Sequence, residues 1–367
     1  MKILYLFANY DSMMFQWQKY HIFDEMAQHN CIFDIISPSN YESNDQLNDG
    51  IIAKVKNNHY DIFFTSYNEE VIWTSTIKEI KKYGVPTVLF CPDNLKDPFR
   101  HKNVASMFDL VWLTSKETEY MFKRWGANTV FLPYAANPNF LKGDIPRVDI
   151  PRVGFIGTPH GSRVANINKL LERGIPLTVH SKKNDTSNAV FRASGKEYIS
   201  LIKDYIRYPI GRKLLCGAVL DKLEKNEIDL NNQNLVLKDP VPFSKFANAN
   251  SSFALTLSFT AANSTGVLKR PVDIVNLRNF EIPMSGGLQF CRYSDEMASY
   301  FEPDKEIVLF HNDDEMIEKA KFYLAEENSG LRMKMKIAAR KRAEQDHTWY
   351  KRFSVIFDKL NLPYDYN

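Results

Sequence analysis

The sequence predicts an α/β fold that contains two successive parallel sheets. Short apolar runs alternate with helical stretches along the chain, and this alternation is typical of parallel strands with helices on both faces. The length of 367 residues exceeds one typical core and suits two domains of about 150–200 residues. A segment with two prolines, residues 142–152, separates the two series, and we interpret it as the linker.

The first series contains six expected strands, at residues 2–8, 31–36, 61–65, 87–91, 110–114 and 129–133. Expected helices separate most of them, at residues 13–29, 69–83 and 116–125. Ligands of parallel sheets bind beyond the carboxyl ends of the strands. The loops at 9–12, 66–68 and 92–94 are therefore candidate ligand loops. Asp93 lies in the third, where a turn aspartate after a proline is the alternative interpretation.

The second series has expected strands at residues 152–157, 176–180, 235–237, 253–257, 288–291 and 307–310. Expected helices follow at residues 244–251, 270–285, 313–325, 329–346 and 347–360. Small residues from Gly157 to Gly161 would let a phosphate approach the backbone, and Arg163 could reach it as a charged donor. A purely structural glycine turn is the alternative. The loop 258–269 adds polar residues that include Asn263 and Ser264.

The stretch from Arg270 to Gly287 carries the main functional signal. Pro271 suits a first helical position, and Asp273 would then lie in the first turn. Gly286 and Gly287 suit the exit of a helix. Glu281 stands among apolar residues, where a carboxylate is costly without a partner. On one helix, Asp273 and Glu281 would lie about 12 Å apart, which suits the two ends of an extended ligand.

Composition excludes several classes of protein. A net charge of +3 is too small to indicate a nucleic-acid partner. The four cysteines show no CxxC pairing, which argues against a zinc site or disulfide framework and favours a reducing cytoplasm. We expect neither a signal peptide nor a membrane span. The histidines are scattered and no GxSxG motif is present, so hydrolases of the metal or Ser-His-Asp type find no support.

One segment of the second series, residues 182–235, is long. Its part from Tyr205 to Leu215 interleaves basic with aromatic and aliphatic residues. Such a stretch could touch a membrane surface or a lipid-linked acceptor. A helix face that packs on a neighbouring element is the alternative. We therefore expect a cytoplasmic protein, with peripheral contact to the inner face of the membrane left open.

The run from Arg278 to Gly287 resembles the signature of GT-B glycosyltransferases of the spore-maturation-protein type. Their relatives, the retaining group 1 glycosyltransferases, carry a Glu-x7-Glu motif. This chain has Glu281 at the second place and departs from the motif with Asp273 at the first. The resemblance is strongest from Arg278 to about Phe357. It implies two Rossmann-like domains that face each other across a cleft.

The resemblance implies residues 1–145 as the acceptor domain, residues 152–345 as the donor domain, and residues 346–367 as a helix that crosses back to the first domain. The donor would be a UDP- or GDP-sugar, and the acceptor a glycan or lipid-linked saccharide of cell-surface polysaccharide synthesis. The implied catalytic residues are Asp273, near the donor sugar, and Asp93, on the acceptor side. The expected donor-binding residues are Glu281, at the ribose, with Arg278, Gly157, Arg163, Asn263, Ser264, Gly286 and Gly287.

No cofactor and no metal are expected. The chain lacks an Asp-x-Asp placed as in metal-dependent glycosyltransferases, and Asp313 with Asp314 fits helix capping better. Arginine, lysine and backbone N–H groups would then stabilise the leaving diphosphate. Two alternatives remain open. One is a nucleotide-sugar epimerase of the same fold, which needs no acceptor and uses acids for proton transfer. The other is a non-catalytic paralogue that binds a sugar or a nucleotide.

Overall fold

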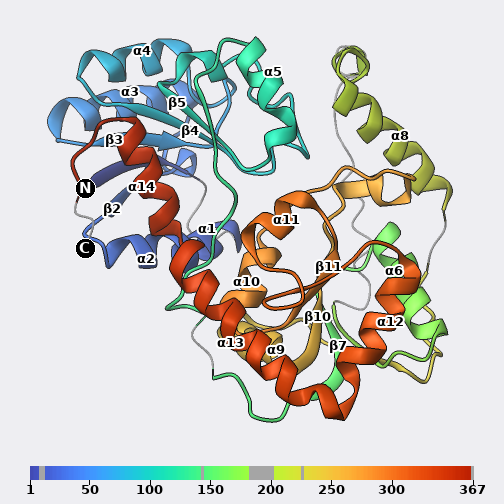
Figure 1. Cartoon of the computed structure of the whole chain (residues 1–367). Helices are drawn as coiled ribbons and strands as arrows, with labels where there is room; N and C mark the ends of the chain where they lie inside the picture. The colour runs from blue at the N-terminus through green and yellow to red at the C-terminus, as the bar shows by residue number, and fades with distance from the viewer. Residues whose placement is uncertain (8–12, 142–143, 182–201, 225–226, 365–367) are drawn as a thin grey trace. The chain divides into compact units, whose positions relative to one another are not determined.

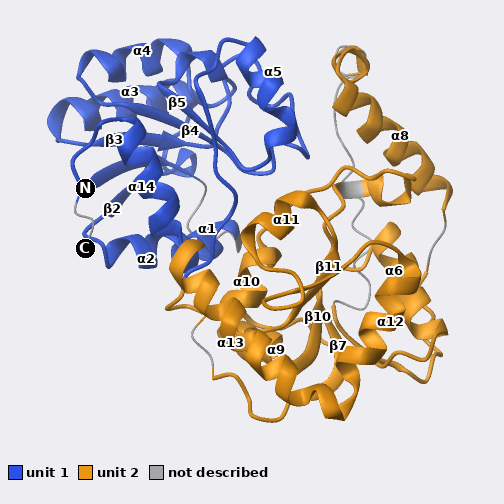
Figure 2. Ribbon diagram, in the orientation of Figure 1, with its two compact units in different colours: residues 1–137, 348–367 blue, residues 138–347 orange. Residues whose placement is uncertain are grey.

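The computed structural model describes residues 1–7, 13–141, 144–181, 202–224 and 227–364 (Figure 1). They form two compact units, each with its own sheet (Figure 2). Unit 1 comprises Met1–Asn137 and Thr348–Asn367, and unit 2 comprises Pro138–His347. The loop 9–12, expected above as a ligand loop, lies outside the described residues.

Unit 1 contains a parallel sheet with the strand order β2-β1-β3-β4-β5-β6. Its strands are β1 Lys2–Leu6, β2 Ile32–Ile36, β3 Ile62–Thr65, β4 Thr87–Cys91, β5 Leu110–Leu113 and β6 Thr129–Phe131. The central strands β3, β4 and β5 are buried along their whole length. Continuous apolar runs are expected for strands that are covered on both faces, so the prediction of six parallel strands is confirmed.

The helices of unit 1 are α1 Met13–Gln18, α2 Asp24–Ala27, α3 Asn44–Asn57, α4 Thr74–Lys82, α5 Glu119–Arg124 and α14 Trp349–Lys359. Short helical turns supplement them, namely η1 Lys19–Phe23, η2 Pro38–Asn40, η3 Ala105–Met107 and η4 Lys116–Thr118. The expected helix 13–29 is interrupted by η1, which is a π-helical turn. The C-terminal helix α14 belongs to this unit because Arg352 donates to the carbonyls of Pro133 and Tyr134.

Unit 2 contains a second parallel sheet, with the order β12-β11-β10-β7-β8-β9. Its strands are β7 Ile150–Ile156, β8 Leu177–His180, β9 Leu235–Lys238, β10 Phe253–Leu257, β11 Gln289–Arg292 and β12 Val308–Phe310. β7 and β10 pair at the centre of the sheet. Gly154 of β7 is needed there because a Cβ would stand 2.2 Å from the ring of Phe253.

The helices of unit 2 are α6 Ser162–Glu172, α8 Pro209–Leu223, α9 Phe246–Ser252, α10 Arg278–Met284, α11 Asp295–Tyr300, α12 Asp313–Leu324 and α13 Ser329–Asp346. Its short 3-10 turns are η5 Phe243–Lys245, η6 Asn263–Val267 and η7 Glu326–Asn328. α12 and α13 match the expected helices closely. The expected helix 270–285 does not form as a whole, since only residues from Arg278 to Met284 are helical.

Candidate functional site

The loop between β7 and α6 forms one side of the candidate site in unit 2. Gly157 and Gly161 both have positive φ, 152° and 55°, which explains why glycine stands at these positions. The loop lies at the carboxyl end of β7, at the centre of the sheet. It leads into the first turn of α6, where Arg163 is anchored by a hydrogen bond of 3.2 Å from Nη1 to the Thr158 carbonyl.

Arg163 is half-buried, which is unfavourable for its charge. Its guanidinium lies 5.8 Å from the centre of the Phe259 ring, a cation–π contact that partly offsets this effect. Burial lowers the pKa of Arg163 below its ordinary value, and the positive charge of Arg278 lowers it further. Two guanidinium groups from different elements, α6 and α10, are thus brought close enough to repel each other. A bound polyanion would relieve this repulsion.

Arg278 and Glu281 form an ion pair within the first turn of α10. Nη1 of Arg278 donates to Oε2 of Glu281 at 2.7 Å. The Glu281 side chain is only 2% exposed, whereas that of Arg278 is 38% exposed. Arg278 also lies over the Phe246 ring, 4.2 Å from its centre. The buried carboxylate of Glu281 is thus paired with a cation that still reaches solvent. Arg278 is the partner that the apolar neighbours of Glu281 in the sequence led us to expect.

The start of α10 is fixed at the carboxyl end of β10 by two asparagines. Oδ1 of Asn276 accepts from the backbone N–H of Arg278, and Oδ1 of Asn279 accepts from the backbone N–H of Asn276. The two side chains thus satisfy backbone N–H groups just before and at the start of α10. The two amide groups also donate to the Phe259 carbonyl and to Oγ of Ser258. They therefore orient Arg278 and Glu281 against the end of the sheet, a role that sequence reasoning missed.

Asp273 is not on the helix of Glu281, so the expected separation of about 12 Å along one helix is wrong. The backbone before α10 instead forms an antiparallel bridge between Asp273 and Ala261. Hydrogen bonds join the N–H of Ala262 to the Val272 carbonyl and the N–H of Ile274 to the Thr260 carbonyl. These residues obtain their backbone partners from a neighbouring segment, which removes the need for a helix.

The Asp273 carboxyl is half-buried, and burial raises its pKa above the ordinary value. The charges of Arg292 and Lys213 act in the opposite direction, while Asp295 adds to the rise. Lys213 lies on α8, within the long segment 182–235, and Arg292 ends β11. Asp273 therefore stands in a cluster of charged side chains drawn from three other elements of unit 2.

Ser264 lies in the 3-10 turn η6, against which α8 packs through Gly217. The side chain of Asn263, in the same turn, lies outside the described part of the chain. Gly286 ends α10 with a positive φ of 76°, as expected. The N–H groups of Gly286 and Gly287 donate to the carbonyls of Pro283 and Ile282. These two glycines thus have a clear structural role at the helix end.

Asp93 lies in unit 1, at the carboxyl end of β4, and is exposed. Its φ is 55°, which is uncommon for a residue other than glycine. Tyr134 holds it on both sides: the phenol donates to Oδ1 at 2.8 Å and accepts from the Asp93 N–H at 3.1 Å. The adjacent Asn94 is buried and accepts from the N–H groups of Thr114 and Ser115. The turn that carries Asp93 is therefore rigidly held.

A second polar residue at this edge of unit 1, His101, was not indicated by the sequence. Its side chain is buried, and its Nε2 lies 3.0 Å from the carbonyl oxygen of Ser66. Burial lowers the pKa of His101 to about 4. The imidazole is consequently neutral at physiological pH. Scattered histidines carry no local signal of this kind, because the burial is created by distant parts of the chain.

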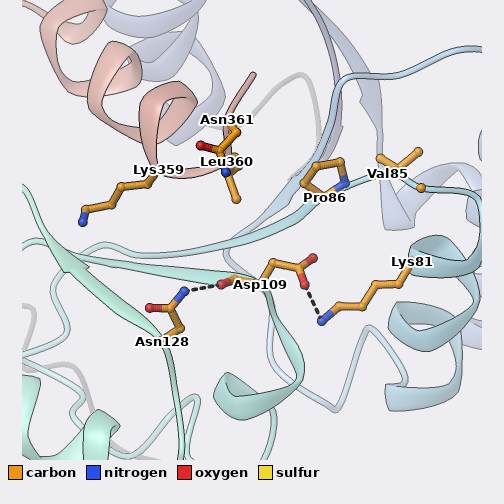
Figure 3. Close-up of a pocket in the computed structure, with 9 residues that line it drawn as sticks. Lys81, Val85, Pro86, Asp109, Asn128, Lys359, Leu360 and Asn361 are labelled. Carbon is orange, nitrogen blue, oxygen red and sulfur yellow. Dashed lines mark hydrogen bonds and ion pairs between the residues drawn. The ribbon is translucent and has the colours of Figure 1, made fainter. Parts of the chain in front are cut away.

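A surface hollow of about 410 Å³ lies at the opposite edge of the unit 1 sheet (Figure 3). Pro86, Asp109 and Asn128, which immediately precede β4, β5 and β6, line it together with Lys81 and Lys359. Ligands of parallel sheets bind at the carboxyl ends of the strands, so this hollow is not the candidate site. Lys81 and Asp109 form an ion pair at 2.8 Å, so the charged residues in the lining of the hollow have a structural role.

The described residues contain no group of three or more histidine, cysteine or acidic side chains placed to hold a metal ion. Among the helices that the structure describes, none has both the length and the apolar character needed to cross a membrane.

Comparisons with known proteins agree with this architecture. Residues 188–358 match the family model described as glycosyl transferase-like. The match includes Arg278 and Glu281 but begins after the loop of Arg163. A search of curated proteins gives no match.

Solved structures match the fold over nearly the whole chain. The Anabaena protein HepE, in complex with UDP and glucose, is 12% identical, with a TM-score of 0.57 over 98% of this chain and 99% of that one. Sucrose-phosphate synthase from Thermosynechococcus elongatus is 11% identical, with a TM-score of 0.55 and the same coverage. An alpha-glucosyltransferase in complex with UDP and DNA is 13% identical, with a TM-score of 0.58, and again covers 98% and 99%. The chain has a GT-B fold.

The predicted fold class is thereby confirmed, and the prediction of a glycosyltransferase is confirmed at the level of a family domain and a fold. The structure brings Arg163, Arg278 and Glu281 together at one end of the unit 2 sheet, with Asp273 on the segment that precedes α10. Asp93 belongs to the other unit.

Proposed function

We propose that this protein transfers a sugar from a UDP- or GDP-sugar to a glycan or lipid-linked saccharide acceptor. The observation that carries the proposal is the ion pair of Arg278 with the buried Glu281 carboxylate at the start of α10, where Nη1 lies 2.7 Å from Oε2. Arg163, anchored at the end of the β7–α6 loop, lies near enough to Arg278 for the two charges to interact. Two cations next to one buried carboxylate leave an excess of positive charge, which suits the diphosphate of a nucleotide sugar.

The diphosphate would bind between the β7–α6 loop and the start of α10. Arginine is well suited to phosphate because its planar donors can contact two oxygens at once. Both guanidinium groups lie near aromatic rings, Phe259 and Phe246, which restrict their orientation. Positive groups fixed in advance stabilise the charge that develops on the leaving diphosphate. Arg163 and Arg278 would therefore act on the transition state as well as on the bound donor.

Glu281 would bind the ribose. An ionised carboxylate has two oxygens with about four acceptor positions. The carboxylate accepts from Arg278, and ribose hydroxyl groups would add to the hydrogen bonds that it accepts. Similar proteins support this donor class: HepE has been solved with UDP and with UDP-glucose. The resemblance to the spore-maturation-protein type and its retaining relatives points to the same assignment.

Asp273 would face the donor sugar, and Asp93 would act on the acceptor side. The sugar would be transferred with retention of the anomeric configuration, so that an α-linked donor gives an α-linked product. The proposed reaction requires no metal, because the arginines supply the positive charge. Transfer should therefore continue in excess chelator, and a complete loss restored by magnesium or manganese would contradict this part of the proposal.

Calorimetric titration with UDP, GDP, UDP-glucose and GDP-mannose tests the donor class. We expect one nucleoside diphosphate to bind, with weaker binding by Arg163→Gln and Arg278→Gln. Lys305→Gln, at an exposed position remote in sequence from both loops, is the matched control and should bind normally. Incubation of the bound nucleotide sugar without an acceptor separates the alternatives: a second nucleotide sugar as product would indicate an epimerase. Absence of binding by every nucleotide would refute the proposed function.

A further inference from the structure

Helix α8 packs onto the donor unit through one of its faces. Ile210, Leu214 and Gly217 are buried and recur at helical spacing. Gly217 lies directly on η6, where a Cβ would stand 3.0 Å from the carbonyl oxygen of Ser264 and from Cα of Thr265. Any larger residue would push the helix away. The contacts of this inner face hold α8 on unit 2. Figure 2 shows the helix at the edge of that unit.

The opposite face of α8 is also apolar, and it is exposed. Cys216, Val219, Leu220 and Leu223 follow the spacing i, i+3, i+4 and i+7, which puts them on one side of the helix. Val219, Leu220 and Leu223 are 61%, 40% and 74% exposed. The helical residues just before α8 add Ile206, which is 54% exposed. Apolar residues thus occupy two faces of α8, and unit 2 covers one of them. The other face is available to a partner.

Basic side chains surround the exposed apolar residues. The region 202–223 contains two acids, Asp204 and Asp221, and more than twice as many basic residues. All of the basic residues are exposed. Those available to a partner are Lys203, Arg207, Arg212 and Lys222, whereas Lys213 interacts with Asp273 at the candidate site. A protein interface can also combine an apolar centre with a polar rim, so a second copy of the chain is one outcome of the test. Exposed aliphatic side chains with flanking lysine and arginine are typical of a helix that lies in the surface of an anionic membrane.

We propose that the outer face of α8, formed by Cys216, Val219, Leu220 and Leu223 with the flanking basic residues, docks on an anionic lipid surface. The aliphatic groups enter the boundary between headgroups and acyl chains, while lysine and arginine contact the lipid phosphates. The inference stands on the exposed surface and does not require the proposed transfer reaction. If that reaction is correct, docking would bring the donor unit to the place where lipid-linked acceptors are found.

The cysteines of this chain allow a direct test. Cys216 is exposed at the edge of the outer face, whereas Cys31, Cys91 and Cys291 are buried. An environment-sensitive fluorophore on Cys216 should shift to the blue with vesicles of phosphatidylcholine and phosphatidylserine. Vesicles of phosphatidylcholine alone should give no shift, and high salt should weaken the response because it screens charge.

Cosedimentation of unlabelled protein with the same vesicles tests the residues. Val219→Glu combined with Leu223→Glu should reduce binding to the anionic vesicles at least about 10-fold, since the substitutions remove aliphatic groups from the membrane boundary and add negative charge next to anionic lipids. Ile337→Glu is the matched control, because Ile337 is 54% exposed on α13; it should bind like the parent. An unchanged melting temperature and unchanged nucleotide binding show that the double variant is folded.

Three results would overturn the proposal. They are binding that is equal with neutral vesicles, binding that survives the double substitution, and a complete lack of vesicle binding by the parent protein. A second copy of the chain is the competing occupant of the face. It would give a concentration-dependent blue shift without vesicles and a doubled mass in light scattering, and this outcome too would refute membrane docking.

Discussion

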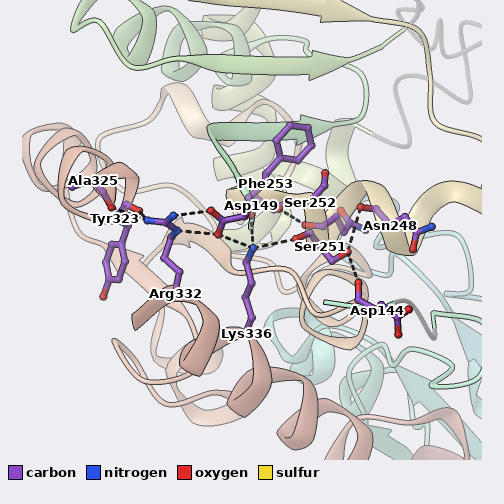
Figure 4. A network of polar contacts seen from close by, with 12 residues as sticks. Asp144, Asp149, Asn248, Ser251, Ser252, Phe253, Tyr323, Ala325, Arg332 and Lys336 are labelled. Atoms are coloured by element: carbon purple, nitrogen blue, oxygen red, sulfur yellow. Dashed lines mark hydrogen bonds and ion pairs between the residues drawn. The ribbon is translucent and has the colours of Figure 1, made fainter. Parts of the chain in front are cut away.

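Arg332 and Asp149 form a two-point ion pair in the interior of unit 2 (Figure 4). Nε and Nη2 of Arg332 donate to the two carboxylate oxygens at 2.9 and 2.6 Å, and the side chains are only 1% and 7% exposed. Lys336, one turn further along α13, donates to the same carboxylate at 3.1 Å and to the carbonyls of Ser251 and Phe253. Asp149 immediately precedes the central strand β7, so the network fastens α13 to the middle of the sheet.

Asp149→Asn should destabilise unit 2 strongly. The substitution keeps the shape but leaves Arg332 and Lys336 as two buried cations without their shared counter-charge. Removal of one partner of a buried ion pair typically costs about 3–5 kcal/mol in the free energy of unfolding. Urea denaturation, followed by circular dichroism, measures the change. Lys305→Ala, which breaks the exposed pair with Glu302, is the control and should have no measurable effect.

The same network makes unit 2 sensitive to acid. The hydrogen bonds and charges of Arg332 and Lys336 hold the pKa of Asp149 below its ordinary value of 3.8, against the opposing effect of burial. A depressed folded-state pKa contributes stability that is present above pH 4 and is lost as the pH falls through the folded value. The stability difference between the parent and Asp149→Asn should therefore shrink below about pH 4. A constant difference down to pH 2 would contradict the ion-pair explanation.

Glu25 predicts a pH effect of the opposite sign in unit 1. Its Oε1 accepts from the backbone N–H of Tyr350, in the first turn of α14, at 2.8 Å. Burial raises the pKa of Glu25 from 4.5 to about 7. A raised folded-state pKa contributes stability that is present below the unfolded value and is lost as the pH rises through the folded value. The loss approaches about 1.4 kcal/mol per pH unit between pH 4.5 and 7.

Glu25→Gln isolates this effect because the amide keeps an acceptor for α14 without the charge. At pH 4.5 the variant should be no more stable than the parent. At pH 8 the variant should be more stable than the parent. Urea denaturation at the two pH values measures the difference. Glu42→Gln, at an exposed site, should leave the pH profile of the parent unchanged. Parallel profiles for Glu25→Gln and the parent would show that Glu25 is not the titrating group.

The strands of both sheets could be predicted from the sequence because each contains a short apolar run. Burial on both faces selects such runs directly in central strands such as β3, β4, β5 and β10. The helix boundaries of α12 and α13 were also well predicted. The error at 270–277 has a specific cause. Val272 and Ile274 form backbone hydrogen bonds with Ala262 and Thr260, and a local pattern of Pro271 followed by Asp273 contains no information about that partner.

The polar residues that fix the structure were harder to predict. Asp149 and Arg332 are 183 residues apart, and nothing in the sequence around either residue indicates the other. Glu281 was recognised because a carboxylate among apolar neighbours signals an unseen partner. The role of Asn276 and Asn279 before α10 had a local signal, since asparagine side chains readily bond to nearby backbone N–H groups at helix starts. The separation between Asp273 and Glu281 could not be predicted, because it depends on the path of the backbone before α10.

Glu281→Gln should weaken nucleotide binding by about 10-fold or more. A hydrogen bond to a charged group contributes roughly 1.5–3 kcal/mol, and about 1.4 kcal/mol is a factor of ten in affinity. The fold should survive because the partner, Arg278, is 38% exposed and remains solvated. Calorimetry with the nucleoside diphosphate measures the change. Glu281→Ala should bind more weakly still.

The effect of Asp273→Asn should be compared with that of Glu281→Gln. If Asp273 faces the sugar, its substitution should reduce turnover more than the affinity for the nucleoside diphosphate. Titration of the two variants with the same nucleotide separates a ribose role from a sugar role. Equal affinity of Glu281→Gln and the parent would remove the ribose assignment, and with it the best-supported residue of the donor site.

Asp93→Asn should reduce turnover with little change in donor affinity, because Asp93 lies in unit 1 and the proposed donor residues lie in unit 2. Loss of a general acid or base typically costs 10²–10⁴-fold in rate, so a decrease of at least about 100-fold is expected. Tyr134→Phe should have a smaller effect, since it removes the hydrogen bonds that hold the carboxylate but leaves the carboxylate in place.

Asp97→Asn is the matched control for Asp93, because it removes an acid four residues further along the same loop, where the backbone N–H of Asp97 donates to the Asp93 carbonyl. Rates at saturating donor, together with calorimetry for the nucleotide, distinguish the three variants. A true acceptor-side role predicts the order Asp93→Asn, then Tyr134→Phe, then Asp97→Asn, from slowest to fastest. Equal losses in Asp93→Asn and Asp97→Asn would mean that the loop tolerates no charge change and that Asp93 has no special chemical role. A loss of nucleotide affinity in Asp93→Asn would instead place that residue with the donor, which contradicts its assignment to the acceptor.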